Sequence, residues 1–178
     1  IGADAAAFFQ NMATSNLNGE YRHLLVAPHS LKSRLLELMD GEIAKARAGE
    51  EGRIFIKVNS VTHRGLIGKL AQASQAGVEV VMNVRGICCL RPGVPGLTDR
   101  IRVFSIVGRY LEHSRIFAFG RGEKARIYIG SADFMTRNTE RRVEIACPIL
   151  DEDVRRQLFH YIQVLCADNR KARLLQAD

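Results

Sequence analysis

Apolar residues recur at two different spacings along the chain, and each spacing predicts a different kind of element. A spacing of three to four residues predicts amphipathic helices over 31–48 and 63–76. Alternation of apolar and polar residues predicts a strand over 53–59, and the almost continuous apolar run over 78–84 predicts a buried parallel strand. Because a strand, a helix and a second strand follow one another closely, this part of the chain is predicted to form a right-handed βαβ unit.

The rest of the chain continues the alternation and closes with a helix. We predict four more strands, the second and third joined as a hairpin by the turn Gly120–Glu123, and a last helix whose apolar stripe ends at Leu165. Ser30, Thr62 and Asp151 are the predicted N-caps of the three long helices. The order of elements predicts an α/β sandwich around a mixed β-sheet flanked by helices. The four strands are predicted at 101–106, 115–119, 125–131 and 142–150.

Composition narrows the class of protein. Of the 178 residues, 47% are hydrophobic and 25% are charged, which is typical of a folded globular domain and excludes wholesale disorder. The sequence has no run of about 20 apolar residues, so no segment is predicted to span a membrane.

Positive charge is concentrated in the middle of the sequence. The chain carries 20 Arg and 6 Lys against 19 acidic residues, and the segment Arg85–Arg142 holds 12 of the basic residues but only 5 acidic ones. The flat guanidinium group binds phosphate oxygens through paired hydrogen bonds, so this segment points to a nucleic acid, a nucleotide or a phosphate polymer as ligand. On charge alone, a solvated surface that only keeps the protein in solution is an equally good interpretation.

Arg85 directly follows the predicted strand 78–84, and Gly86 beside it lets the backbone approach a ligand closely. Ligands of open α/β sheets bind beyond the carboxyl ends of the strands. Without further support, however, Arg85 is interpreted as a residue that only opens a surface loop.

His113 is the histidine with a chemical context. In an extended segment His113 and Arg115 share one face about 7 Å apart, and Ser131 and Asp133 share a face beyond the hairpin. Imidazole can attack phosphorus or donate a proton, guanidinium neutralises charge on phosphoryl oxygens, and a carboxylate can fix the imidazole tautomer. The other four histidines are predicted to be surface or capping residues: His23, His29, His63 and His160.

The combined pattern resembles a known family. His113-Ser114-Arg115 followed by Gly130-Ser131-Ala132-Asp133 is similar to one half of a phospholipase D-type site, HxK…D…GSxN, with three departures. Arg115 replaces Lys, Gly120 stands where the motif has Asp, and Asp133 replaces Asn. In this altered form the pattern resembles the second phospholipase-D-like domain of bacterial polyphosphate kinases of the first type. The resemblance runs from about Leu31 to the last helix and is densest in Val84–Gly86, Ser105–Val107, Arg109–His113 and Ser131–Asn138.

The resemblance implies a kinase that reversibly transfers the terminal phosphate of ATP to inorganic polyphosphate with Mg²⁺, whose ligands would lie mainly outside this chain. Residues 1–27 would be the tail of a preceding catalytic domain or a linker helix, and 28–178 the C-terminal phospholipase-D-like domain. The histidine that is transiently phosphorylated would belong to the preceding domain, and no metal site is expected in this chain.

The resemblance also assigns roles to single residues. His113 would contact the phosphates of ATP and donate or accept a proton, and Arg85 would grip a phosphate group. Supporting phosphate contacts are expected from five further residues, for which structural hydrogen bonding is the equally weighted alternative: Arg115, Ser131, Asp133, Arg137 and Asn138.

The implied partners are ATP or ADP, inorganic polyphosphate and the preceding domains of the same chain, with a homo-oligomer for the full-length protein and no nucleic acid. The expected location is the cytoplasm, with or without peripheral contact to the inner membrane, and the fragment is expected to be inactive alone. Two alternatives stay open. A phospholipase D-type phosphodiesterase or nuclease would need the missing Lys and Asp, and a non-catalytic polyanion-binding module would bind in a salt-dependent way without turnover.

Overall fold

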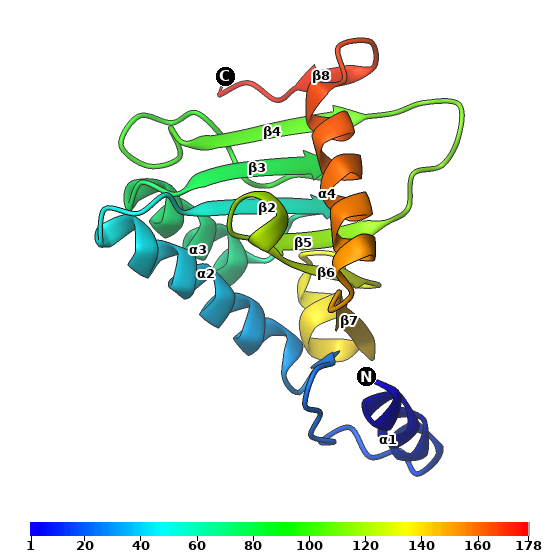
Figure 1. Cartoon of the computed structure of the whole chain (residues 1–178). Coiled ribbons are helices and arrows are strands. Elements are labelled where there is room, and N and C mark those ends of the chain that lie inside the picture. The colour runs from blue at the N-terminus through cyan, green and yellow to red at the C-terminus, as the bar shows by residue number, and fades with distance from the viewer. Residues whose placement is uncertain (178) are drawn as a thin grey trace.

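The computed structural model describes residues 1–177, and Asp178, the last residue of the predicted domain 28–178, lies outside them. The strands form one eight-stranded mixed sheet in the order β1-β7-β6-β5-β2-β3-β4-β8, which confirms the predicted α/β architecture (Figure 1). The elements in chain order are α1 (Gly2–Ala13), β1 (Leu25–Ala27), α2 (Leu31–Arg47), β2 (Arg53–Val58), α3 (Arg64–Gln75), β3 (Glu79–Val84), β4 (Ile101–Ile106), β5 (Arg115–Phe119), η1 (Gly122–Lys124), β6 (Arg126–Gly130), η2 (Arg137–Arg141), β7 (Glu144–Pro148), α4 (Glu152–Ala167) and β8 (Ala172–Leu174).

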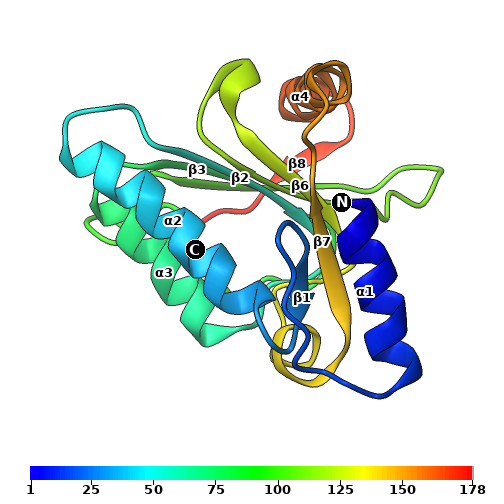
Figure 2. The same ribbon diagram turned by 60° about the horizontal axis from the view of Figure 1, so that its bottom comes forward.

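Three parallel strands form the centre of the sheet. β2 pairs with β3 and β3 with β4, while β5, β6 and β7 continue the sheet beyond β2 in antiparallel pairs, and β8 pairs antiparallel with β4. Helices α2 and α3 cover one face of the sheet and α4 covers the other (Figure 2). The carboxyl ends of β2, β3, β4 and β6 therefore lie at the same end of the sheet as the amino end of β5. We call this end of the sheet the carboxyl edge.

Alternating side chains build a separate apolar core on each face of the sheet. In β2, Ile54 and Ile56 pack with α2 and α3, whereas Phe55 points to the opposite face and packs with α4. Phe117 of β5 stacks on Phe134, with ring centroids 5.6 Å apart, and so fixes the segment that follows β6. Full burial of such a side chain stabilises the fold by about 1.5–3 kcal/mol. The sheet is therefore a firm base for the loops at its carboxyl edge.

The helix starts agree with the predictions in two cases and differ in one. Asp151 caps α4 as predicted, because its Oδ1 accepts hydrogen bonds from two N–H groups of the first turn. Ser30 occupies the N-cap position of α2 as predicted, but its side chain bonds the main chain of β1 and makes no cap hydrogen bond. Thr62 was the wrong N-cap for α3: His63 takes that position, and its Nδ1 accepts from the N–H of Leu66 at 3.2 Å.

Glu140 connects the π-helical turn η2 to the starts of both helices on one face. Its carboxylate lies 2.5 Å from Lys32 Nζ at the start of α2 and 3.0 Å from Nε2 of His63, the N-cap of α3. These partners, Lys32 foremost, lower the pKa of Glu140 to about 2. The charged carboxylate therefore stabilises the folded chain over the whole range in which it stays ionised.

We expect Glu140→Gln to lower the urea midpoint of unfolding at pH 7. The pKa of Glu140 falls from 4.5 to about 2 on folding, so its contribution is complete above pH 4.5 and is lost as the pH falls towards 2. The difference in urea midpoint between the variant and the wild type should therefore disappear as the pH falls from 4.5 to about 2. Glu37→Gln, at an exposed pair within α2, is the control and should change little. A gap at pH 2 as large as at pH 7 would contradict this account.

Candidate active site

Strand register brings four separate segments together at the carboxyl edge. Arg115 at the start of β5 lies opposite Gly130 at the end of β6, and β5 also pairs with β2. Asn59 and Arg85 directly follow β2 and β3, which end at the same edge. Gly130 is required there because a Cβ atom on it would lie 2.6 Å from the carbonyl oxygen of Ile145. The backbone thus aims the residues after β2, β3 and β6 at the segment before β5.

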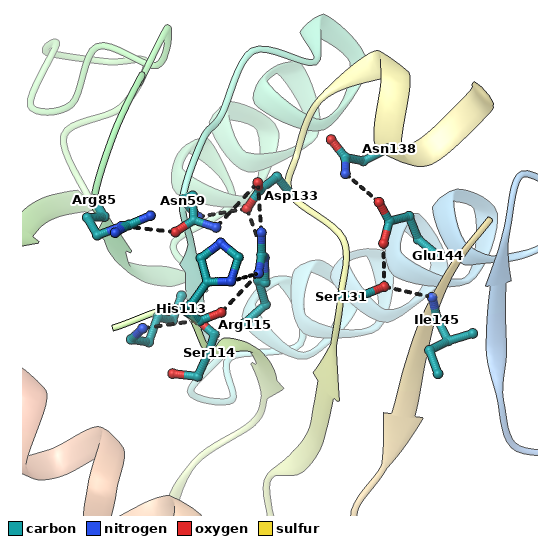
Figure 3. Close-up of polar contacts among 11 residues, drawn as sticks. Asn59, Arg85, His113, Ser114, Arg115, Ser131, Asp133, Asn138, Glu144 and Ile145 are labelled. Atoms are coloured by element: carbon teal, nitrogen blue, oxygen red, sulfur yellow. Dashed lines mark hydrogen bonds and ion pairs between the residues drawn. The ribbon is translucent and has the colours of Figure 1, made fainter. Parts of the chain in front are cut away.

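A continuous series of polar contacts runs along this edge from Arg85 to His113 (Figure 3). Arg85 Nε donates to Asn59 Oδ1 at 3.1 Å, and the Asn59 main-chain N–H donates to Asp133 Oδ1 at 2.7 Å. Arg115 donates to both carboxylate oxygens of Asp133 at 3.2 Å, and its Nη1 lies 3.1 Å from His113 Nδ1. Four predicted site residues therefore form one connected group, with Asn59 as the link.

The pair of Arg115 and Asp133 is the most enclosed part of the group. Their side chains are only 12% and 9% exposed. A two-point contact of this kind fixes the guanidinium plane as well as its distance. Neither partner can be removed without leaving the other's charge poorly solvated.

The contact with Arg115 also fixes the tautomer of His113. A guanidinium group has only hydrogen-bond donors, so Nδ1 of His113 accepts from Arg115 Nη1. The same Nη1 donates to the His113 carbonyl oxygen at 2.9 Å, which holds the main chain in place. The ring proton of neutral His113 is consequently on Nε2, and the ring is exposed to solvent.

Buried Lys57 anchors the segment that carries His113. Its Nζ donates to the Ser114 carbonyl oxygen at 3.0 Å and lies 3.6 Å from Glu112. Tyr161 of α4 donates to the same Glu112 at 2.5 Å. Burial lowers the pKa of Lys57, and the hydrogen bond from Tyr161 lowers the pKa of Glu112. The position of His113 therefore depends on contacts with both β2 and α4.

Ser131 and Asn138 belong to a second group, centred on Glu144. The Ser131 hydroxyl donates to Glu144 and accepts from the N–H of Ile145, and Asn138 Nδ2 donates to Glu144 at 2.6 Å. Ser131 thus turns towards β7, away from the contacts of Asp133, contrary to the expectation that the two act from one face. Among the described residues, the buried Asn138 Oδ1 has no hydrogen-bond partner.

The arginine-rich segment is divided between the two edges of the sheet. Arg85 and Arg115 lie at the carboxyl edge, and Arg137 is exposed on η2, where its side chain makes no polar contact within residues 1–177. Arg121 lies at the opposite edge and pairs with Glu79 and Glu51 at 2.9 and 3.1 Å. The net positive charge of the arginine-rich segment is therefore larger than the positive charge that this segment places at the carboxyl edge.

An apolar groove of about 610 Å³ opens beside the site, between α4 and strands β5 to β7. Arg115 and Ser131 border it, so the groove touches both polar groups. Its apolar walls come from the three strands and from α4, namely Ile116, Ile129, Ile145, Cys147, Leu158 and Tyr161.

The sequence analysis missed Asn59, Lys57, Tyr161 and Glu144. The position of Asn59 after a predicted strand was visible, but nothing in the pattern linked it to Asp133. Lys57 interrupts the apolar run of β2, and a lysine within a buried strand was a signal that could have been read. Tyr161 and Glu144 reach the site only through the packing of α4 and β7.

The described residues offer little for a metal ion. No group of three or more His, Cys, Asp or Glu side chains in 1–177 is arranged to hold one. The carboxylates nearest the site are occupied by Arg115, Ser131 and Asn138. No helix in this part of the chain is long and apolar enough to cross a membrane.

Comparison with known proteins decides the family. Residues 24–178 match the family model of polyphosphate kinase C-terminal domain 2. The chain belongs to the polyphosphate kinase family. The polyphosphate kinase of Thermosynechococcus vestitus is 48% identical over 100% of this chain and 24% of its own length, and that of Bacillus cereus is 46% identical over 100% and 25%. The chain thus corresponds to C-terminal domain 2 of this family and spans about a quarter of the length of these curated relatives.

Solved structures confirm the predicted phospholipase-D-like fold. Polyphosphate kinase from Porphyromonas gingivalis superimposes with a TM-score of 0.91 at 36% identity, over 98% of this chain and 27% of that one. Nuc from Salmonella typhimurium, a phospholipase D family member, superimposes with a TM-score of 0.61 at 14% identity, over 86% of this chain and 96% of that one. Identity this low shows the shared fold alone.

In this polyphosphate kinase domain, we expect Asp133→Asn to lower the free energy of unfolding by about 3 kcal/mol, because Arg115 keeps its enclosed charge but loses the carboxylate. Urea unfolding at pH 7 measures the change. Asp40→Asn, at an exposed pair with Lys69, is the matched control and should cost less than about 1 kcal/mol. Equal effects of the two substitutions would contradict the importance given to the enclosed pair.

We expect Tyr161→Phe to loosen the segment before β5 without unfolding the domain. The variant removes only the hydroxyl that donates to Glu112. Amide hydrogen exchange over residues 112–115 should become faster, while exchange in β2 and β3 stays unchanged. Tyr110→Phe, at an exposed tyrosine in the loop between β4 and β5, is the control and should leave amide exchange over residues 112–115 unchanged. Unchanged exchange in Tyr161→Phe would show that α4 does not hold this segment.

Proposed function

We propose that this chain holds the phosphates of ATP at its carboxyl edge, as the C-terminal catalytic domain of an enzyme that reversibly transfers the γ-phosphoryl group to inorganic polyphosphate. A phosphohistidine on a preceding domain of the parent protein carries the group in transit. The observation that carries the proposal is the series of contacts from Arg85 to His113. Phosphoryl transfer needs donors fixed in advance around the phosphate oxygens, and this series fixes two guanidinium groups and one imidazole.

Arg85 is the proposed phosphate-gripping residue. Only its Nε is engaged by Asn59 among the described contacts, which leaves the two terminal nitrogens for phosphate oxygens. Arg115 is proposed to act by positioning His113, since Asp133 takes two of its donor groups and the third faces His113. Ser131 and Asn138 act by holding Glu144, and Arg137 is proposed as a further phosphate contact on η2.

His113 is proposed to donate a hydrogen bond from Nε2 to a phosphate oxygen. Attack on phosphorus by Nε2 would need a lone pair there and hence the ring proton on Nδ1, facing the Arg115 guanidinium. That arrangement is unfavourable, so the covalent role falls to the histidine of the preceding domain. There a phosphorus–nitrogen bond forms as the bond from the γ-phosphorus to its bridging oxygen breaks and ADP leaves. In the second step a terminal oxygen of polyphosphate forms a bond to the phosphorus as the phosphorus–nitrogen bond breaks, which completes the transfer.

The apolar groove favours a nucleotide over polyphosphate alone as a ligand. A pocket with apolar walls and cations at its rim suits a molecule with a flat base and a charged tail. ATP has both parts, whereas polyphosphate has only charge. The groove is accordingly proposed to take the nucleoside part of ATP.

Several properties of the whole enzyme remain part of the proposal. Mg²⁺ is proposed to accompany ATP with ligands mainly outside this chain, because the carboxylates at the edge are already paired. The parent protein is proposed to act as a homo-oligomer in the cytoplasm, with its own preceding domains as partners and no nucleic acid.

A phospholipase D-type phosphodiesterase or nuclease is the competing function. Such an enzyme uses the histidine as nucleophile, and a cation at Nδ1 opposes that use. The replacement of Lys by Arg115 and of Asn by Asp133 disfavours it further. A polyanion-binding module without turnover describes the expected behaviour of this chain on its own.

We expect His113→Ala in the parent enzyme to lower the rate of polyphosphate synthesis from ATP roughly 10²- to 10⁴-fold. The fold should be intact, because His113 is exposed and its ring touches only Arg115 among the described contacts. Transfer of labelled phosphate to acid-insoluble polymer measures the rate. His160→Ala, at an exposed histidine of α4, is the matched control and should retain full activity.

Full activity in His113→Ala would remove this residue from the mechanism. The chain of 178 residues alone should bind ATP and polyphosphate weakly without turnover. Synthesis or hydrolysis of polyphosphate by this chain alone would place the whole reaction at the carboxyl edge and overturn the assignment of the phosphohistidine to a preceding domain.

A further inference from the structure

Cations continue along the carboxyl edge beyond Arg85, on the outermost strand of the sheet. β8 pairs with β4 so that Arg173 lies opposite Ser105, and Ser105 Oγ donates to the Arg85 carbonyl oxygen at 3.4 Å. Lys171 directly precedes β8, and it lines the same hollow as Arg173. We call Arg85, Lys171 and Arg173 the cationic strip. Since neighbouring strands are about 4.8 Å apart, the backbone of Arg173 lies roughly 10 Å from that of Arg85.

None of the three cations is neutralised by an acid. Across residues 1–177, Arg85, Lys171 and Arg173 take part in no ion pair. The nearest candidate, Asp168, accepts hydrogen bonds from three main-chain N–H groups at the start of β8, which lower the pKa of its carboxyl. Asp168 thus fixes the turn through its main-chain contacts, and it forms no ion pair with Lys171 within residues 1–177.

The surface beside these cations is hollowed and free of acidic side chains. One hollow of about 330 Å³ is lined by Ser105, Val107, Lys171 and Arg173. A second, of about 180 Å³, shares Ser105 and Arg173 and extends past Gly86 towards the end of β3. The two hollows together connect the strand of Arg85 with that of Arg173.

We propose that the cationic strip binds inorganic polyphosphate beyond the phosphates that react, so that an extended chain lies across the ends of β3, β4 and β8. The inference rests on the proposed function. A linear polyanion fits a row of unpaired cations better than a compact ligand does, because successive stretches of the chain meet successive positive groups. Exposed cations act weakly one by one and are screened by salt, so Lys171 and Arg173 add affinity for long chains and have no part in the transfer itself, in which only Arg85 of the strip takes part.

The test compares Lys171→Gln/Arg173→Gln with a matched control, Lys124→Gln/Arg126→Gln, in the 178-residue chain. The control also removes one lysine and one arginine, both exposed and unpaired among the described residues, but at the opposite edge of the sheet. The probes are long-chain polyphosphate and tripolyphosphate at low ionic strength. The strip variant should bind the long chain roughly three- to tenfold more weakly. Its Kd for tripolyphosphate, and both Kd values of the control, should change less than twofold.

The strip would be overturned if both variants lost the same affinity for long-chain polyphosphate. It would also be overturned if the strip variant lost as much affinity for tripolyphosphate as for the long chain. If the binding of single-stranded DNA of similar charge is weakened by the Lys171 and Arg173 substitutions as strongly as the binding of polyphosphate, the surface is a nucleic-acid surface instead. A wild-type chain that binds neither phosphate probe would contradict the proposed function, whereas binding that ignores these two cations contradicts the strip alone. Unfolding curves verify both variants. Lys171→Gln alone replaces the double variant if the latter is unstable, and it should retain part of the loss.

Discussion

The ion pair of Arg115 and Asp133 is the contact on which the carboxyl edge depends. It joins the start of β5 to the segment after β6, and through Asp133 it also holds the main chain of Asn59 after β2. Because both side chains are nearly enclosed, a missing partner would leave a charge with little water and few alternative contacts. The pair therefore sets the geometry of three loops at once. Arg85 and His113, which lie at the two ends of the series, take their positions from it.

An enclosed arginine that is fully paired changes what the site can offer a ligand. Asp133 neutralises Arg115, so the net positive charge that remains at the edge comes mainly from Arg85. Lys57 is in the same situation, since Ser114 and Glu112 occupy its ammonium group. These inner cations make their hydrogen bonds to protein groups and position the loops, so the proposed phosphate contacts fall to the outer cations. The division explains how a chain with so many arginines can present only a few of them at one place.

The sequence predicted the elements that have a clear periodicity and missed contacts that depend on register. Alternation in 53–59 and the almost continuous apolar run in 78–84 located β2 and β3, and the position of Arg85 at a strand end followed from the second. β8 has only three residues and no alternation that could be distinguished from a loop. Thr62 was chosen as N-cap on residue type, whereas the turn geometry gave that place to His63. His113, Arg115 and Asp133 were predicted as site residues, but Asn59 could be linked to them only once β2 and β5 were paired.

Two of the three departures from the phospholipase D pattern are best understood together. Arg115 stands where that pattern has Lys, Asp133 stands where it has Asn, and the structure pairs these two residues with each other. An arginine facing an aspartate forms two hydrogen bonds with it, so both side chains are engaged with each other. The exchange also places a guanidinium donor at His113 Nδ1 and leaves the ring proton on Nε2. The proposed role of His113, to hold a phosphate while another group reacts, therefore depends on this compensated pair.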